Sequence, residues 1–65
     1  MNANSQEGYL IEFRRIGNAT KVSAVDPETG TEVSIVGPTS AGQETLSRNA
    51  INKLKYVLAK NGDAS

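Results

Sequence analysis

The fold is decided by two turn signals within residues 9–36, which read YLIEFRRIGNATKVSAVDPETGTEVSIV. The first signal is Gly17-Asn18, a pair that suits the two-residue type II′ turn of a β-hairpin. Pairing Ile16 with Ala19 across this turn sets the register of the two flanking strands. Counting outward from the turn, the apolar residues that face each other are then Phe13 with Val22 and Ile11 with Ala24.

The second signal is Asp26-Pro27-Glu28-Thr29-Gly30-Thr31, in which proline presets φ and glycine supplies a left-handed position. A four-residue loop pairs Asp26 with Thr31. Both turns then place apolar residues on one face, in two rows formed by Phe13, Val22 and Ile35 and by Ile11, Ala24 and Val33. A slip of one residue would turn a strand's apolar set to the other side, so this agreement predicts a three-stranded antiparallel meander.

A C-terminal helix should follow the third strand, which ends at Gly37-Pro38 because proline offers no N–H to a sheet. Ser40 with Gln43 fits a capping box at the helix start, and Asn61-Gly62 supplies a stop. One face of this helix is apolar, with Leu46, Ala50, Ile51, Leu54, Val57 and Leu58. We therefore predict an α+β fold of β-β-β-α order, with the helix packed on one face of the sheet.

The length of 65 residues allows one small domain, which we place at residues 9–61. Residues 1–8 and 62–65 are polar and are expected to be disordered tails. The sequence has no cysteine and no histidine, so neither a disulfide nor a thiolate or imidazole metal site can reinforce the thin core. We therefore expect a homodimer, formed either by pairing of strand edges or by exchange of helices across Gly37-Pro38.

Two surfaces are candidates for binding. The face of the sheet away from the helix, together with the edge of the third strand, gives a candidate self-association surface of Leu10, Ile16, Val25, Glu32, Ser34 and Val36. The C-terminal part of the chain is the basic part, with four Lys or Arg against one acid in residues 45–65 and three against six in residues 1–44. Its candidate anion or nucleic-acid contacts are Arg48, Lys53, Lys55, Tyr56 and Lys60.

The residue types argue against catalysis, because the commonest general base is absent and the acidic residues are dispersed. We expect no enzyme activity, no cofactor and no metal. The first eight residues lack the apolar run of a secretory signal, and no stretch is long and apolar enough for a membrane span, so we expect a cytoplasmic protein.

The runs Phe13-Arg14-Arg15-Ile16-Gly17-Asn18 and Lys21 to Pro38, with Lys53-Leu54-Lys55-Tyr56-Val57-Leu58, carry a resemblance. They resemble a family of very short alphaproteobacterial proteins that contain a domain of unknown function. The resemblance covers nearly everything outside the two tails and implies a bacterial cytoplasmic protein, but it brings no activity or site residues.

Our first interpretation is a self-associating interaction module that serves as an accessory or adaptor protein. Besides itself, it would bind a protein partner that the sequence does not identify. The alternative is a small dimeric nucleic-acid-binding protein that uses the basic face of the helix.

Overall fold

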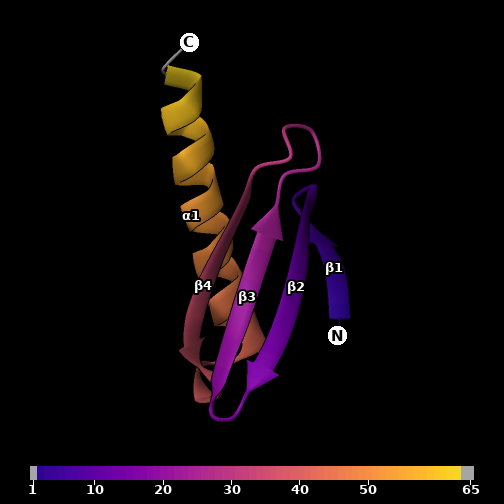
Figure 1. Ribbon diagram of the computed structural model, residues 1–65, viewed down its shortest axis with the longest axis vertical. Helices are drawn as coiled ribbons and strands as arrows, with labels where there is room; N and C mark the ends of the chain where they lie inside the picture. The colour runs from indigo at the N-terminus through magenta and orange to yellow at the C-terminus, as the bar shows by residue number, and fades with distance from the viewer. Residues whose placement is uncertain (1, 64–65) are drawn as a thin grey trace.

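The computed structural model describes residues 2–63, and the side chains of residues 7–62. Within these residues the strands are β1 (Asn2–Gln6), β2 (Tyr9–Ile16), β3 (Ala19–Val25) and β4 (Glu32–Pro38), followed by a 3-10 turn, η1 (Thr39–Ala41), and a helix, α1 (Gln43–Asp63). The strands form one antiparallel sheet in the order β1-β2-β3-β4 (Figure 1). The predicted meander with a C-terminal helix is confirmed as β2 to β4 and α1.

The register of β2, β3 and β4 is the one that the two turns predicted. Ile16 pairs with Ala19, Phe13 with Val22 and Val22 with Ile35. At the second turn, Asp26 N donates to Thr31 O over 2.9 Å. Gly17 has a positive φ of 61°, whereas Asn18 does not have a positive φ. This combination is the one that a type II′ turn at Gly17-Asn18 requires.

Asp26 is buried, and its carboxylate organises the second turn. Its oxygens accept hydrogen bonds from Glu28 N at 3.0 Å and from Thr29 Oγ1 at 3.2 Å. Gly30 N donates to the Asp26 carbonyl over 2.7 Å, and Gly30 has φ 75°. An aspartate that binds its own backbone two residues ahead stabilises a turn, so this side chain has a structural role.

The strand β1 corrects the expectation that residues 1–8 are a tail. It pairs with β2 from Gln6 opposite Tyr9 to Asn2 opposite Phe13, and Glu7 and Gly8 form the connecting turn with φ 55° and 84°. Apart from Ala3 the strand is polar, so it lacks the alternation with large apolar residues that marks a half-buried strand in a sequence. Met1 lies outside the described residues.

The ends of α1 also differ from the prediction. No hydrogen bond joins Ser40 to Gln43, so the capping box is absent. Instead Gly42 precedes the helix with φ 87° and ψ 151°, a conformation essentially restricted to glycine, and its carbonyl accepts from Leu46 N. At the other end α1 continues through Gly62 to Asp63, since glycine costs a helix only about 1 kcal/mol. Residues 64 and 65 lie outside the described residues.

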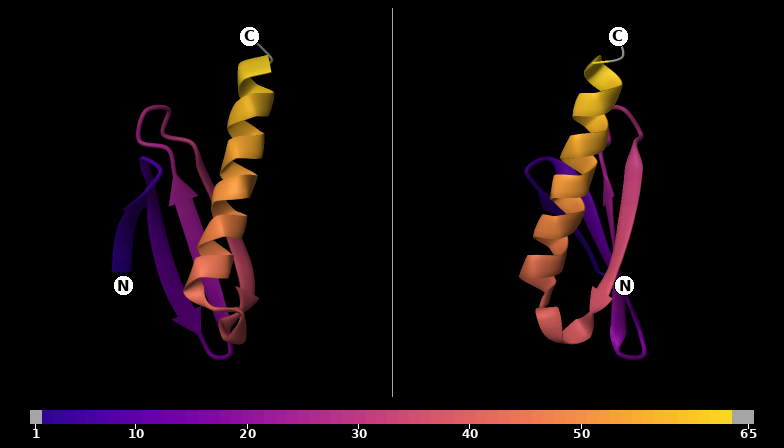
Figure 2. Two further views of the ribbon diagram at one scale, coloured as in Figure 1. Left: turned by 180° about the vertical axis from the view of Figure 1, so that it is seen from behind. Right: turned by 90° about the vertical axis from the view of Figure 1, so that its left-hand side faces the viewer.

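The core lies between α1 and one face of the sheet, mainly under β3 and β4 (Figure 2). Its fully buried centre includes Ile11, Val22 and Leu54. Phe13, which the sequence placed at the start of an apolar row, is only partly buried at the margin. Gly37 permits the close approach of the helix start, because a Cβ at this position would lie 2.5 Å from Leu46 Cδ2.

Candidate interaction surface

The sheet has a second face that α1 does not cover, which we call the open face. The helix lies behind the sheet in the view of Figure 1 and in front of it when the molecule is turned round in Figure 2. The open face of β2, β3 and β4 consists of Leu10, Glu12, Arg14, Ile16, Ala19, Lys21, Ser23, Val25, Glu32, Ser34, Val36 and Pro38.

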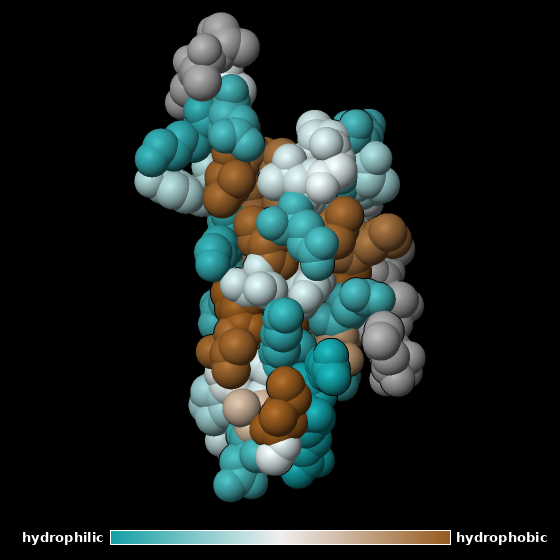
Figure 3. Space-filling model, in the orientation of Figure 1, coloured by the Kyte–Doolittle hydropathy of each residue, from teal (hydrophilic) through white to brown (hydrophobic). Residues whose placement is uncertain are grey.

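The register arranges the open face in four rows that cross the three strands. From the end near the second turn to the end near Gly17, the rows are Leu10–Val25–Glu32, Glu12–Ser23–Ser34, Arg14–Lys21–Val36 and Ile16–Ala19–Pro38. On β2 the two outer rows are therefore apolar and the two inner rows are charged. Figure 3, which views this face, shows hydrophobic areas separated by hydrophilic ones.

Large apolar side chains are exposed on the open face. The exposed fraction is 45% for Leu10, 59% for Ile16 and 68% for Val36, and Val25 is half-buried. All six residues of the predicted self-association surface, Leu10, Ile16, Val25, Glu32, Ser34 and Val36, lie on this one face. These exposed side chains make the open face the candidate interaction surface of the protein.

The charged centre of the open face has no ion pairs of its own. Within the described part of the chain the ion pairs are Glu44–Arg48 and Glu7–Lys55. Arg14 lies directly opposite Lys21, an arrangement that destabilises a sheet because like charges are held close together. The surface is hollowed here, in a depression lined by Glu12, Phe13, Arg14, Lys21, Ser23 and Glu32.

The free edge of β4, which the sequence proposed for strand pairing, is indeed an edge of the sheet. Because Asp26 and Thr31 form a hydrogen-bonded pair, alternation turns the backbone groups of Ser34 away from β3. The Ser34 carbonyl accepts a hydrogen bond from Lys53 Nζ at 3.1 Å. A lysine therefore occupies part of this edge, which is a common way of protecting an edge from pairing.

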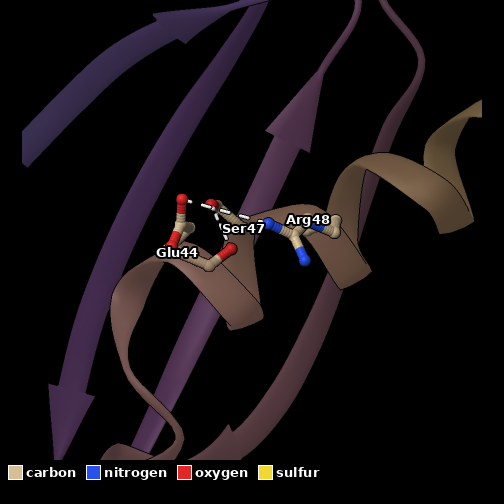
Figure 4. A network of polar contacts seen from close by, with 3 residues as sticks. All are labelled: Glu44, Ser47 and Arg48. Carbon is tan, nitrogen blue, oxygen red and sulfur yellow. Dashed lines mark hydrogen bonds and ion pairs between the residues drawn. The ribbon is translucent and has the colours of Figure 1, made fainter.

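The predicted basic surface of α1 is divided among contacts within the chain. A guanidinium nitrogen of Arg48 lies 3.9 Å from Glu44 Oε2. The backbone carbonyl of Glu44 also accepts a hydrogen bond from Ser47 Oγ (Figure 4). Lys60 Nζ lies 5.9 Å from the centre of the Tyr56 ring. Lys53 reaches the β4 edge, whereas Lys55 Nζ reaches Glu7 Oε1 over 2.6 Å at the β1–β2 turn. Lys53 and Lys55 therefore extend from α1 in different directions, Lys53 to the β4 edge and Lys55 to the β1–β2 turn.

The ion pair between Lys55 and Glu7 connects the helix to the turn before β2. The hydrogen bond to Glu7 and the charge of Glu7 raise the pKa of the Lys55 ammonium above its ordinary value. Sequence analysis missed this contact because it placed Glu7 in a tail. The available signal was Gly8, which follows Glu7 and can adopt the second positive φ of a two-residue turn.

Residues 2–63 provide neither a cluster of metal-ligating side chains nor a helix suited to span a membrane. No group of three or more side chains of Asp, Glu, His or Cys type lies close enough together there to hold a metal ion. No helix in the same residues combines the length and apolar character needed to cross a membrane.

Fold and surface together define a small α+β protein whose sheet is covered by a helix on one face and left open on the other. A family described as "Domain of unknown function (DUF6898)" matches residues 6–61, and the chain belongs to this family. No curated protein and no solved structure matches the chain significantly.

Proposed function

We propose that this protein is a non-catalytic interaction module that acts by self-association through its open face, as an accessory or adaptor protein. The observation that carries the proposal is the exposure of Leu10, Ile16 and Val36 on a sheet face that no other element of the described chain covers. Transfer of such side chains from water to an interface gains about 1 kcal/mol each at this degree of exposure. We also propose the bacterial, cytoplasmic setting that the family resemblance implies.

A second copy of the chain is the partner that the charges of the open face fit best. Glu12 and Glu32 supply two negative charges, and Arg14 and Lys21 supply two positive charges. A surface with equal numbers of both signs can match charges with a second copy of itself, whereas a strongly acidic or basic partner would leave half of the charges unmatched. Self-association through one shared surface also gives closed, two-fold dimers, the commonest kind of oligomer.

Nucleic-acid binding by α1 is the less favoured function. Its four cations are spread over different contacts, with Lys53 on the Ser34 carbonyl and Lys55 on Glu7, so they do not form one strip along a phosphate backbone. Binding of nucleic acid would therefore require these contacts to be given up. Submicromolar binding that falls steeply with salt and is lost in Lys53→Glu would favour this function over ours.

Sedimentation equilibrium of the purified chain tests self-association directly. We expect a monomer–dimer equilibrium between micromolar and millimolar concentration, and a melting temperature that rises with concentration. Ile16→Glu should weaken the dimer by at least about tenfold, since an unpaired charge would be buried in the interface. Tyr56→Glu is the matched control, because Tyr56 is 66% exposed on the other side of the molecule.

Three outcomes distinguish an interface on the open face, an interface on the helix and the absence of self-association. A dimer that is weakened by Ile16→Glu and unaffected by Tyr56→Glu supports the open face as the interface. A chain that stays monomeric at millimolar concentration contradicts self-association. A dimer that responds to Tyr56→Glu and not to Ile16→Glu places the interface on the helix instead.

A further inference from the structure

We infer that two copies stack their open faces about a two-fold axis that lies in the interface and runs across the strands, so that Glu12 of each copy meets Arg14 of the other. This inference rests on the proposed function and adds to it the geometry and the paired residues. It follows from the order of the four rows, from the unpaired charges in the two inner rows and from the ways in which two sheets can face each other.

The open-face residues of β2 have an order that is complementary to its own reverse. The open-face residues of this strand run Leu10, Glu12, Arg14, Ile16, so an apolar residue lies at each end and an acid and a base lie between them. Reversing this order places Leu10 against Ile16 and Glu12 against Arg14. The strand is therefore complementary to a second copy of itself that runs in the opposite direction.

A two-fold axis in the interface can run either across the strands or along them. A two-fold axis that lies in the interface across the strands reverses the rows and keeps β2, β3 and β4 each over its own copy. Each copy then places Leu10 over Ile16, and Val25 over Ala19, of its partner. An axis along the strands would instead set β2 over β4, with Leu10 against Glu32 and Arg14 against Val36. That alternative also sets Lys21 against the Lys21 of the partner, and it leaves Glu12 without a cation. The first axis leaves only Glu32 of the four charged groups against an apolar residue, Pro38, so the rows favour the first axis.

The open face also carries a like-charge pair, Arg14 and Lys21. These side chains lie opposite each other in one row, and neither has an acidic partner within the described residues. In the stacked dimer their row faces the row of the second copy that begins with Glu12. The carboxylate of that Glu12 lies over Arg14 and beside Lys21, so it compensates both cations. The pair of Arg14 and Lys21 is unfavourable within one chain, but in the stacked dimer it can bind Glu12 of the second copy.

The twist of real sheets is compatible with this pairing. Face-to-face sheets pack about 10 Å apart with strand directions that differ by about 30°. At this angle, a strand next to the central strand is shifted by about 2.4 Å along its length relative to the same strand of the partner. This shift is well below the roughly 6.8 Å between successive residues on one face. The rows nearest the axis are the charged ones, so the pairing of Glu12 with Arg14 is the least affected.

The interface is small. The three strands β2, β3 and β4, about 4.8 Å apart and about 23 Å long, have a face of about 330 Å² per copy, so the dimer buries about 660 Å² in total. This value lies below the range of stable complexes, so the association is weak and transient. We therefore expect the charge pairs to determine the orientation of the dimer more than its affinity.

Reciprocal charge reversal tests the geometry. Glu12→Arg alone would set arginine against Arg14 twice, and Arg14→Glu alone would set glutamate against Glu12 twice, so each variant should dimerise at least about tenfold more weakly than the wild type. An equimolar mixture of the two variants should form a heterodimer with nearly wild-type affinity, because each contact again joins an acid to a base. The double variant with both changes should likewise recover.

Two controls match the charge changes away from the open face. Glu28→Arg makes the same change as Glu12→Arg in the exposed second turn, and Arg15→Glu makes the same change as Arg14→Glu on the other side of β2. Both controls should dimerise like the wild type, and far-ultraviolet circular dichroism should show that all variants remain folded. The double variant keeps the net charge and composition, so it tests the geometry even if a single variant is poorly folded.

Each outcome has one meaning. Weakened single variants whose mixture recovers support the two-fold geometry. A wild-type dimer that ignores both single changes, or whose weakened variants stay apart when mixed, overturns the geometry but leaves self-association in place. A wild-type chain that is monomeric throughout overturns the proposed function and this inference together.

Discussion

The two faces of the sheet are built from the same strands, and neighbouring residues have opposite environments. Ile11 is 0% exposed beneath α1, whereas Leu10 beside it is 45% exposed on the open face. Both are aliphatic, so their chemistry does not distinguish them. What distinguishes them is the helix, which removes one face from water and leaves the other available to a second molecule.

The faces also differ in how their polar groups are satisfied. On the covered side of the molecule, Thr20 Oγ1 lies 2.9 Å from Thr39 Oγ1, and among the described side chains no buried polar atom lacks a hydrogen-bond partner. On the open face, Glu12, Arg14 and Lys21 have no ionic partner within the same part of the chain. The polar groups of the covered face are thus satisfied within the monomer, whereas the open face carries charges that have no ionic partner among the described residues.

The largest effect should come from removing apolar volume on the covered face. Ile11→Ala is expected to lower the free energy of unfolding by about 2–5 kcal/mol, because a fully buried side chain is lost and a cavity remains. Leu10→Ala, the adjacent change on the open face, should cost less than about 1 kcal/mol in the monomer. Urea denaturation at low protein concentration measures both values.

An equal cost of these two changes would mean that the faces are assigned wrongly. Phe13→Ala adds a finer test. Phe13 lies at the margin of the helix and is only partly buried, so its truncation should cost less than that of Ile11.

An intermediate effect is expected where α1 first approaches the covered face. Gly37→Ala would place a Cβ 2.5 Å from Leu46 Cδ2, and Leu46 is itself buried, so the helix or its side chain must shift. Such overpacking costs about 1–3 kcal/mol. Thermal denaturation monitored by circular dichroism measures the loss.

Gly62→Ala is the control for this change. It is also a glycine-to-alanine substitution, but, apart from its chain neighbours and the nearby backbone of α1, no described atom lies within 4 Å of the new Cβ. Its melting temperature should be unchanged or slightly higher, because alanine favours a helix over glycine. If Gly37→Ala melts like Gly62→Ala, the close approach of helix and sheet is not as tight as the structure indicates.

The smallest effect is expected for the contact between the helix and the β1–β2 turn. Glu7→Gln removes the charge that raises the pKa of Lys55 above 10.5, and both side chains are about half exposed, so the melting temperature should fall only slightly. A raised lysine pKa in the folded state gives stability that is fully present below pH 10.5 and is lost as the pH rises through the raised value.

The difference in melting temperature between wild type and Glu7→Gln should therefore be constant at neutral pH and vanish in strong alkali. Glu28→Gln is the control, since Glu28 is exposed in the second turn and has no ion pair among the described residues. A difference that persists unchanged above the raised pKa would show that Glu7 acts by some means other than its charge on Lys55.

The register of β2, β3 and β4 and the composition of both faces could be derived from local sequence alone. Two turns with strong local preferences set the pairs Ile16–Ala19 and Asp26–Thr31, and strand geometry then assigns every residue between them to one side. The predicted self-association residues were found on one face for this reason. The order of charges along β2 follows from the same alternation.

Features that depend on contacts between residues distant in sequence could be seen only in the folded chain. The polar strand β1 has no pattern of its own, and its placement beside β2 rests on backbone pairing. The margin position of Phe13 depends on α1 lying mainly over β3 and β4, and the contacts of Lys53 with Ser34 and of Lys55 with Glu7 depend on where the helix lies across the sheet. Local preferences act over a few residues, whereas the position of a helix on a sheet is set by the packing of the whole apolar stripe.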